Sequence, residues 1–546
     1  MDHPRRLTSG NETLAQTISH GFNAERVKAG NSIDDNVIAV TDARDICRII
    51  QSVEQDRVET GTVGLPWHKL LAYEVGSIIY NLYFHPLAKF PGPWLARSTL
   101  LWRLWCTMDG RHHENFHKQH AKHGPVFRVS PNELSFSSLQ SYKDIYGFPS
   151  PGSEQCIKSD FYDIFGNGFK TGCIGSERNP KVHARKKKNL LAAFSAKALA
   201  AQEDIIQRCI NGFISKIGRI SQKSSEGINL VEWFEMSSFD LLGEMAFGES
   251  FGCIQSEKHH FWIDLVLQHV REITLMDNLR RFTLLSALAK WILPSLILSV
   301  RAHHTKYTRE KVQRRLESTS SRQDFLTNVV ERVKSGDLPL EEMAAHSSTL
   351  IIAGGETTAT TMAAVMYYLL KTPRAMEKLT AEIRGRYKTY DEIDSTSALQ
   401  LPYLQAVINE ALRIHPSGAH GHPRISPGTQ IDGHWVPKGT EVYTSTWSVS
   451  HGAEYFADPD AFIPERWTDP YSKDIKEASQ PFSLGFRACI GRSFAYLQMS
   501  LVLSKMLFTY DFALLNKDLD WEAQSKHYVM WWKAPIQVRA TNRLGS

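Results

Sequence analysis

Long hydrophobic runs, paired cysteines and an excess of one charge are all missing from this 546-residue sequence. No uninterrupted apolar stretch reaches the roughly twenty residues that a membrane-spanning helix needs. The seven cysteines are odd in number and form no C-x-x-C pair, which favours a reducing compartment over a disulfide framework. The 63 Lys and Arg residues nearly balance the 58 Asp and Glu residues, which excludes a general nucleic-acid binder. What remains is a large chain of globular composition.

The N-terminal part divides into a polar segment and a short apolar one. Residues 1–65 are polar and have no apolar run near their start, so they do not resemble a secretory signal, and no role is predicted for them. Residues 66–93 hold an apolar stretch of about fifteen residues, interrupted by Glu74 and Asn81, and then a proline-rich hinge. We expect this stretch to lie at a membrane surface or to be the remnant of an anchor.

Helical periodicity dominates most of the remaining chain. Long helices are predicted over 343–371 and 402–415, and a strand-turn-strand over 126–137. Near the C-terminus, 528–532 and 536–540 are expected to pair as a hairpin. This pattern predicts one large, mainly α domain with small β-sheets.

One stretch near the C-terminus has the sequence F-x-x-G-x-R-x-C-x-G, and each defined type suits a thiolate bound to haem iron. Gly485 and Gly491 are expected to turn a β-bulge that aims backbone N–H groups at the sulfur of Cys489. Phe482 would shield the sulfur from water, and Arg487 would pair with a haem propionate. The helix predicted after Gly491 would add positive partial charge near the thiolate. The alternative is a buried structural cysteine in a glycine-containing turn.

A second motif, A-G-G-E-T-T, lies in the middle of the predicted helix 343–371. Two glycines inside a helix cost about 1 kcal/mol each, so a functional gain is expected from them. We predict a local widening of the helix that admits O2 and a water molecule. Glu356 and Thr357 would then form an acid–alcohol pair that relays protons. The alternative is a kinked core helix with Glu356 at its surface.

These motifs resemble the signatures of the cytochromes P450. The cysteine stretch closely resembles the haem-binding signature of that family, and A-G-G-E-T-T resembles its oxygen-activation motif. The hinge is similar to that of microsomal members, especially those of filamentous fungi, although these carry a full apolar span before it. The resemblance covers roughly residues 80–543 and implies the cytochrome P450 fold, with the haem domain at 94–546.

The resemblance also implies roles for single residues. Cys489 matches the axial thiolate ligand of haem b. Arg487 and Arg424 match contacts to the haem propionates. Many relatives have a further contact in a W-x-x-x-R motif; here His183 and Lys187 stand at the equivalent positions.

A structural triad is implied by the same family. Glu410 and Arg413 lie three residues apart on a predicted helix, and alone they are most often a solvated surface pair. In the family this pair binds a later arginine, here Arg466, and the triad supports the cysteine loop. The family pattern P-E-R-F appears here with Trp467 in its last place.

The implied function is that of a haem-thiolate monooxygenase. It would oxidise a hydrophobic small molecule, a terpenoid or polyketide intermediate of secondary metabolism, with O2 and electrons from a separate NADPH-cytochrome P450 reductase. The expected location is the cytosolic face of the endoplasmic reticulum membrane or the cytosol. Two alternatives remain: a P450-fold enzyme of isomerisation, dehydration or peroxide-driven chemistry, and a haem protein without turnover.

One motif points to a different class of protein. His113, Glu114 and His117 form H-E-x-x-H, the spacing of a zinc hydrolase. The surrounding residues are basic and polar, so we interpret this stretch as a wet surface helix and the zinc hydrolase as a remote alternative. The basic run 185–188 is most often a solvated face, and in the P450 family this helix lies where an acidic reductase docks.

The substrate pocket is assigned by family analogy. We expect a mostly apolar lining, because its predicted segments carry mostly apolar side chains. Those segments are 161–173, 261–285, 353–357, 417–422 and 529–531.

Overall fold

The structure, a computed structural model, describes residues 67–149, 151–166, 168–282, 294–318 and 324–543. The chain divides into two units, Met1–Val75 and Gly76–Ser546. The predicted polar segment 1–65 lies outside the described residues. Within the described part of the chain, no helix has both the length and the apolar character to cross a membrane.

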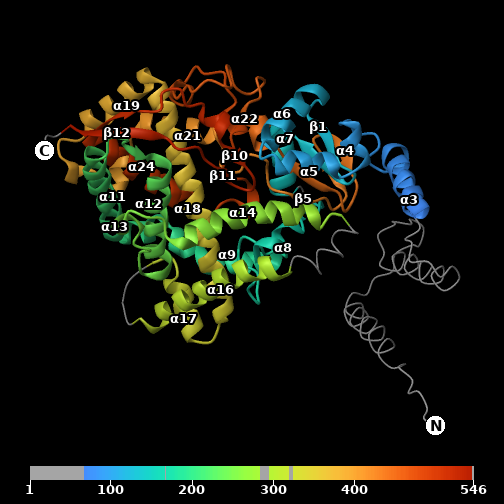
Figure 1. Cartoon of the computed structure of the whole chain (residues 1–546), viewed down its shortest axis with the longest axis horizontal. Helices are drawn as coiled ribbons and strands as arrows, with labels where there is room; N and C mark the ends of the chain where they lie inside the picture. Colours follow the sequence, from blue (N-terminus) through green and yellow to red (C-terminus); the bar gives the residue numbers. More distant parts are fainter. Residues whose placement is uncertain (1–66, 150, 167, 283–293, 319–323, 544–546) are drawn as a thin grey trace, which may run out of the picture. The chain divides into compact units, whose positions relative to one another are not determined.

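Helices make up most of the second unit (Figure 1). The α-helices of the described residues are α3 (Trp67–Ile79), α4 (Trp94–Ser98), α5 (Leu101–Met108), α6 (His112–His123), α7 (Leu139–Tyr146), α8 (Phe161–Gly166), α9 (Pro180–Leu191), α10 (Ala196–Ala201), α11 (Glu203–Lys223), α12 (Leu230–Phe247), α13 (Cys253–Ser256), α14 (Phe261–Leu279), α16 (Pro294–Glu317), α17 (Thr327–Lys334), α18 (Leu340–Lys371), α19 (Pro373–Arg386), α20 (Ser395–Leu399), α21 (Pro402–Ile414), α22 (Thr446–Ser450), α23 (Glu465–Thr468), α24 (Arg492–Thr509) and α25 (Trp521–Gln524). Single turns of other helix types are the π-helix η1 (Tyr80–Phe84) and the 3-10 helices η2 (Ala192–Phe194), η3 (Tyr390–Glu392), η4 (Lys476–Ala478) and η5 (Gly485–Arg487).

The strands form small sheets at the edges of this helical unit. They are β1 (Val126–Ser130), β2 (Glu133–Phe136), β3 (Ile157–Lys158), β4 (Ile228–Asn229), β5 (Arg424–Ile425), β6 (Thr429–Ile431), β7 (His434–Val436), β8 (Glu441–Thr444), β9 (Tyr510–Leu514), β10 (Lys526–His527), β11 (Trp531–Trp532) and β12 (Gln537–Asn542). The largest sheet has the order β1-β2-β8-β5-β3, and β2 and β8 run parallel. The mainly α fold with small sheets, predicted from the sequence, is confirmed.

The sheet β4-β12-β9 corrects one prediction. Residues 536–540 were expected to pair with 528–532, but β12 pairs with β9 and β4, and β11 pairs with β10. Alternating apolar residues define which face of a strand is buried, and they do not define its partner. The predicted hairpin is therefore wrong.

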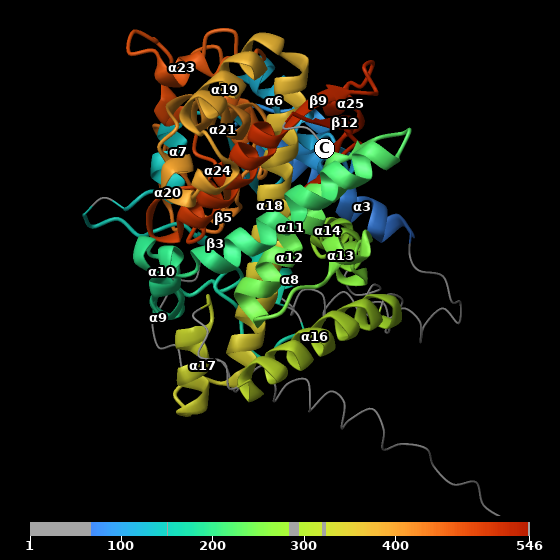
Figure 2. The ribbon, with the colours of Figure 1, turned by 90° about the vertical axis from the view of Figure 1, so that its left-hand side faces the viewer.

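The long helix α18 is the central element of the core. It contacts α12, α16, α21 and α24, and Figures 1 and 2 show it running beside α12. Its sequence explains its ends, because Glu341 and Glu342 lie in the first turn, Lys371 lies in the last turn and Pro373 follows. Most side chains of α18 are buried, so this helix can carry a polar motif into the centre of the unit.

The hinge region packs onto the first strands. Arg128 in β1 donates to the carbonyl oxygen of Asn81 at 2.7 Å, and Arg97 donates to that of Ala88 at 3.0 Å. Several large apolar side chains nearby stay more than two-fifths exposed. They are Ile79, Tyr80, Tyr83, Phe84, Trp94, Leu101 and Trp105.

Candidate functional site: an accessible cysteine beside unmatched cations

The cysteine stretch forms a tight turn directly before α24. The backbone N–H of Cys489 donates to the carbonyl oxygen of Phe482 at 2.9 Å. Gly485 has a φ of +67°, and a Cβ at this position would collide with the carbonyl oxygen of Tyr146, so the turn needs glycine. The predicted β-bulge is wrong, because the loop turns through the 3-10 helix η5 and Gly491 (φ −85°) is the N-cap residue of α24.

Cys489 differs from the other described cysteines in its accessibility. Its side chain is exposed, whereas the others are buried or half-buried. The protein atoms that surround the sulfur raise the pKa of the thiol. The backbone N–H of Gly491, the Lys187 ammonium and the backbone N–H of Arg492 oppose this rise in pKa, because each favours a negative sulfur. Such a thiol loses its proton readily once a metal ion binds it.

Phe482 supports the loop through ring contacts. Its ring centroid lies 5.4 Å from that of Tyr496, and the Arg492 guanidinium lies 5.8 Å from the Phe482 ring. This packing joins the start of the cysteine stretch to the first turns of α24.

Arg424 and Arg487 have no carboxylate partner among the described residues. Arg424 donates to the Tyr162 hydroxyl at 3.0 Å, and Arg487 donates to the backbone carbonyl oxygens of Glu177 and Arg178 at 2.7 and 2.8 Å. Burial and the nearby charge of Arg424 lower the pKa of Arg487 to about 10. The two guanidinium groups therefore repel each other, and Tyr162 and Glu177 oppose the fall in the pKa of Arg487 only in part.

Two further cationic or basic side chains join these arginines. Lys158 on β3 pairs across the sheet with Arg424 on β5, and its pKa is held well below its ordinary value by burial and by both arginines. Burial and Arg487 lower the pKa of His183 to about 3. We call Lys158, His183, Arg424 and Arg487 the cation group. It fits an anionic ligand, and the two propionate carboxylates of a haem have the required charge.

Lys158 was not found by sequence reasoning. It stands in a two-residue strand and belongs to no motif, so only its position across from Arg424 connects it with the site. The short lysine-bearing strand carried no pattern that could have indicated this contact.

The basic run on α9 is only partly exposed. Lys187 donates to the carbonyl oxygens of Phe486 and Ala488, at 2.8 and 3.4 Å, and so contacts the cysteine loop. Lys186 is buried, with 1% of its surface exposed. The interpretation of 185–188 as one solvated face is therefore wrong, because its members point to both sides of the helix.

Glu410, Arg413 and Arg466 lie together and are buried. The Glu410 carboxylate accepts hydrogen bonds from Arg413 at 2.8 and 2.9 Å and from Arg466 at 3.0 Å. Trp467 donates its indole N–H to the same carboxylate at 2.9 Å, a bond that a phenylalanine at this position cannot make. Every acceptor site of this buried acid is used.

The glycines of α18 serve helix packing. A Cβ at Gly354 would lie 3.0 Å from Leu242, and one at Gly355 would lie 2.8 Å from Phe239, so both glycines admit side chains of α12. The helix α18 is continuous from Leu340 to Lys371. The predicted widening is therefore wrong, since close packing of α12 already accounts for the glycine pair.

Glu356 forms a buried cluster with two charged residues that sequence reasoning missed. Lys533 donates to Glu356, lies 2.8 Å from a carboxylate oxygen of Glu235 and lies 3.3 Å from the Thr360 hydroxyl. Burial raises the pKa of Glu356 to about 7, Lys533 opposes the rise and Glu235 adds to it. One cation between two carboxylates leaves one negative charge in excess, which is relieved when Glu356 holds a proton.

Thr357 faces a different side of α18 from Glu356. Its hydroxyl donates to the carbonyl oxygen of Ala353 at 2.6 Å, and Ser417 donates to the carbonyl oxygen of Thr357 at 3.2 Å. Thr357 is half-buried, and Glu356 is only 1% exposed. The alternative of Glu356 at the surface is therefore wrong, and the acid and the alcohol are adjacent in sequence without sharing a hydrogen bond.

The H-E-x-x-H helix is not the wet helix that its composition predicted. His113 is buried, and its ring centroid lies 4.7 Å from that of Trp447 and 4.8 Å from that of Trp531. His117 packs elsewhere, with its centroid 6.2 Å from that of His451. In the described part of the chain, the ligand atoms of His113, Glu114 and His117 do not form a group that could share one metal ion.

A cavity lined by several of the predicted pocket segments combines apolar surface with paired charges. Phe161 and Val529 contribute apolar surface, and Arg103, Glu133 and Asp277 also line it. The Arg103 guanidinium binds Glu133 at 2.8 Å and Asp277 at 2.6 Å. Most of the accessible lining is apolar, which agrees with the prediction from the sequence, and the charges at the wall pair with one another.

Comparison with known proteins identifies the class to which this fold and site belong. The family model of the cytochromes P450 matches residues 91–540. Cytochrome P450 monooxygenase ORF9 of Penicillium roqueforti is 52% identical over 469 residues, which cover 86% of this chain and 92% of the relative. Cytochrome P450 monooxygenase BOT4 of Botryotinia fuckeliana is 48% identical over 84% of this chain and 87% of its own. Trichothecene C-15 hydroxylase of Fusarium sporotrichioides is 34% identical over 86% of this chain and 96% of its own.

The chain belongs to the cytochrome P450 family. It is a haem-thiolate monooxygenase, an oxidoreductase, and its relatives place it among the monooxygenases of fungal secondary metabolism. Members of this class use O2, a substrate and a redox partner. The family, the fold class and the type of reaction predicted from the sequence are all confirmed.

Proposed function

We propose that Cys489, as a thiolate, is the axial ligand of the iron of haem b. The observation that carries this proposal is the pairing of an accessible thiol with a cation group that lacks carboxylates. Arg424 and Arg487 bind the propionates, with Lys158 and His183 beside them. Haem iron bound to a thiolate supplies the activation of O2 that monooxygenation needs.

The residues of the loop keep this thiolate in place. Gly485 permits the turn, Phe482 anchors it on α24, and Gly491 places the helix N-terminus beside the sulfur. Lys187 donates to the loop carbonyl groups and brings a positive charge near Cys489. Glu410, Arg413 and Arg466 hold the segment that precedes the loop.

Glu356 and Thr357 supply and orient the protons that the reaction needs. Glu356 has a pKa near neutrality, so it can both hold and release a proton at physiological pH. Lys533 positions this acid and is not itself in contact with substrate. The Thr357 hydroxyl donates a hydrogen bond to the carbonyl oxygen of Ala353, so its own oxygen can accept a hydrogen bond.

The redox partner is an NADPH-cytochrome P450 reductase. The exposed Arg185 and Lys188 on α9 provide positive charge on the same helix that contacts the cysteine loop through Lys187. The location is the cytosolic face of the endoplasmic reticulum membrane, and the exposed aromatic side chains Tyr83, Phe84 and Trp94 support contact with a lipid surface.

The substrate is a hydrophobic small molecule of terpenoid or polyketide type. One relative is a hydroxylase of a trichothecene at C-15, which supports a secondary metabolite as substrate. The charges at the cavity wall pair with one another, so the apolar part of the wall is left to contact a hydrophobic substrate.

Isotope labelling tests the reaction. The haem-loaded protein is mixed with a reductase, NADPH and ¹⁸O2, and terpenoid and polyketide extracts of a fungal culture are screened for a labelled product. We expect one ¹⁸O atom in the product and NADPH oxidation that depends on the substrate. A product formed without ¹⁸O and without NADPH would instead show isomerisation or dehydration, and the monooxygenase mechanism proposed for these residues would be wrong.

A further inference from the structure

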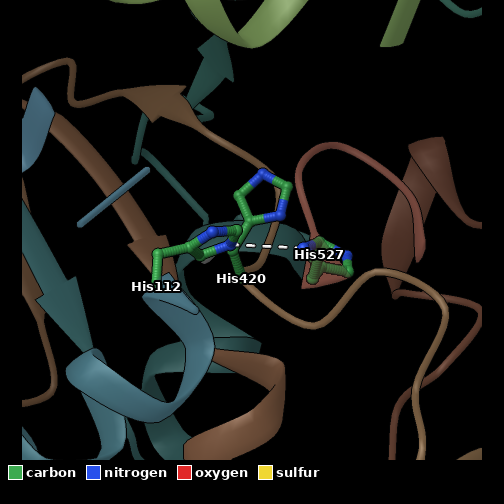
Figure 3. Close-up of side chains that lie close together, drawn as sticks. All are labelled: His112, His420 and His527. Carbon is green, nitrogen blue, oxygen red and sulfur yellow. Dashed lines mark hydrogen bonds between the residues drawn. The ribbon is translucent and has the colours of Figure 1, made fainter. Parts of the chain in front are cut away.

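Three histidines from distant parts of the sequence meet beside the cavity. His112 is the first residue of α6, His420 lies in the turn before β5, and His527 lies on β10 (Figure 3). One ring nitrogen of each lies within 4.8 Å of the corresponding nitrogens of the other two. His112 and His420 also line the cavity described above.

The spacing within this group suits coordination of one shared ion. His527 Nδ1 lies 3.3 Å from His112 Nε2, close enough for a hydrogen bond when one of the two nitrogens carries a proton. Two nitrogens bound to one tetrahedral zinc ion at 2.0–2.1 Å lie about 3.3–3.4 Å apart. The observed separation therefore matches two ligands of a shared ion.

The outer contacts leave lone pairs available inside the group. His527 Nε2 lies 3.3 Å from the carbonyl oxygen of Ser417, so this nitrogen carries the proton and Nδ1 keeps its lone pair toward His112. The Nδ1 atoms of His112 and His420 are buried and have no hydrogen-bond partner among the described residues.

The group lies between an aromatic wall and a wall with paired charges. The centroid of His527 lies 4.9 Å from that of Trp531. At the cavity wall, Arg103 places positive charge near His420, and Asp277 and Glu133 place negative charge there.

We propose that His112, His420 and His527 bind one divalent metal ion of the zinc type, separate from the haem iron. Three imidazole nitrogens occupy three tetrahedral positions, and a water molecule or a substrate oxygen from the cavity takes the fourth. The ion ties α6, the turn before β5 and β10 together at the cavity wall. This site does not include the H-E-x-x-H pair, because in the described part of the chain only His112, His420 and His527 bring their ligand atoms within 4.8 Å of one another.

Zinc binding by the haem-loaded, full-length protein tests this proposal. The protein is dialysed against a chelator, re-equilibrated with ZnCl2, separated by gel filtration and analysed for zinc and iron by mass spectrometry. We expect one zinc per haem iron in the wild type. Each of His112→Gln, His420→Gln and His527→Gln is expected to weaken zinc binding at least roughly tenfold, since each loses a ligand.

His113→Gln is the matched control. His113 is buried next to His112 in the same helix and contacts Trp531, as His527 does, so its loss perturbs the packing without removing a ligand. It should keep zinc binding unchanged. The reduced, carbon monoxide-bound haem spectrum of every variant reports separately on folding and on the haem site, so a failure of the zinc proposal leaves the haem proposal testable.

X-ray absorption at the zinc edge completes the test on the wild type alone. We expect a first shell of three imidazole nitrogens and one oxygen at zinc. No bound zinc after re-equilibration, sulfur in the first shell, or equal weakening by His113→Gln and His112→Gln would each overturn the proposal.

Discussion

Two pairs of arginines in this molecule differ in whether a carboxylate binds their guanidinium groups. Arg413 and Arg466 share the carboxylate of Glu410 at 2.8–3.0 Å. Arg424 and Arg487 bind a tyrosine hydroxyl and backbone carbonyl oxygens, and no described carboxylate pairs with either. The first pair is neutralised within the protein, and the second is not.

This difference separates arginines that stabilise the fold from arginines that bind a ligand. A buried ion pair with all of its hydrogen bonds made needs nothing else, and removing one member leaves an uncompensated charge. A group of cations that lower one another's pKa gains from an anionic ligand. The family resemblance implied the same two roles, and the contacts of each guanidinium supply the physical reason for them.

Removing the shared carboxylate is expected to have the largest effect. Glu410→Gln leaves Arg413 buried without a counter-charge and Arg466 with Asp474 alone, so we expect the free energy of unfolding to fall by about 3–5 kcal/mol. Urea denaturation monitored by circular dichroism measures this loss.

Glu465→Gln provides the control for that experiment. Glu465 pairs with Arg374 and Lys378, whose side chains are at least half exposed, so the expected loss is at most about 1 kcal/mol. Equal effects of the two substitutions would contradict the assignment of Glu410 to a neutralised core cluster.

Removing a cation from the second pair should act on haem and not on folding. Arg487→Gln loses charge-assisted bonds to a propionate, about 1.5–3 kcal/mol, so we expect haem to dissociate roughly tenfold to a hundredfold faster. Transfer of haem to an excess of apomyoglobin measures the rate. Arg178→Gln breaks partly exposed pairs with Asp160 and Asp163 and a hydrogen bond to the backbone carbonyl oxygen of Lys158, but it removes no side chain of the cation group, so it should leave the rate unchanged. A large fall in stability without faster haem loss would show that Arg487 stabilises the fold, as Arg413 and Arg466 do, and does not bind haem.

The cluster of Glu356, Glu235 and Lys533 lies between these two cases, because one lysine neutralises only one of the two carboxylates. Glu356→Gln removes the proton donor, so we expect product formation to slow roughly a hundredfold while NADPH oxidation continues. Lys533→Met should show a smaller loss, since it removes the group that positions the acid. The ratio of product to NADPH consumed measures both. An unchanged ratio in Glu356→Gln would exclude it from proton delivery.

The raised pKa of Glu356 also predicts a pH dependence of stability. Its pKa rises from 4.5 in the unfolded chain to about 7 in the folded protein, so the folded state binds the proton more tightly. The stabilising contribution is complete below pH 4.5 and is lost as the pH rises to about 7. We therefore expect the urea midpoint of the wild type to fall across this range relative to that of Glu356→Gln. Parallel midpoints would contradict the raised pKa.

The smallest effect is expected at the exposed aromatic surface. Replacing Tyr83, Phe84 and Trp94 by serine removes side chains that are about seven-tenths exposed and carry no core packing, so stability should stay within about 0.5 kcal/mol. Binding to phospholipid vesicles should weaken severalfold, measured by sedimentation. Both the wild type and this variant keep Arg97, which donates to the backbone carbonyl oxygens of Leu82 and Ala88 and so holds this region in place. Unchanged vesicle binding would show that this surface does not bind the membrane.

The sequence predicted the elements that carry dense local motifs. The loop around Cys489, the long helix α18 and the pairing of Glu410 with Arg413 depend on residues close together in the chain. The turn glycine, the helix periodicity and the i,i+3 spacing are local physical requirements, so they are visible without a structure.

Contacts between distant segments could not be predicted in the same way. Lys158 and Lys533 each approach the site from a short strand or a loop that contains no motif, and no spacing connects Lys533 with Glu356. The strand β12 shows alternation, but alternation does not select β9 as its partner. The histidines of α6 have a polar local sequence and are buried only because β10 and α22 pack over them.

The central claim is that Cys489 is the thiolate ligand of haem iron, and one spectrum tests it most directly. The purified, haem-loaded protein is reduced with dithionite and exposed to carbon monoxide. We expect a Soret band shifted far to the red, and the loss of this shift in Cys489→Ser. A wild-type protein that retains haem but shows no such shift would contradict the claim, because a ligand other than the Cys489 thiolate would then hold the iron.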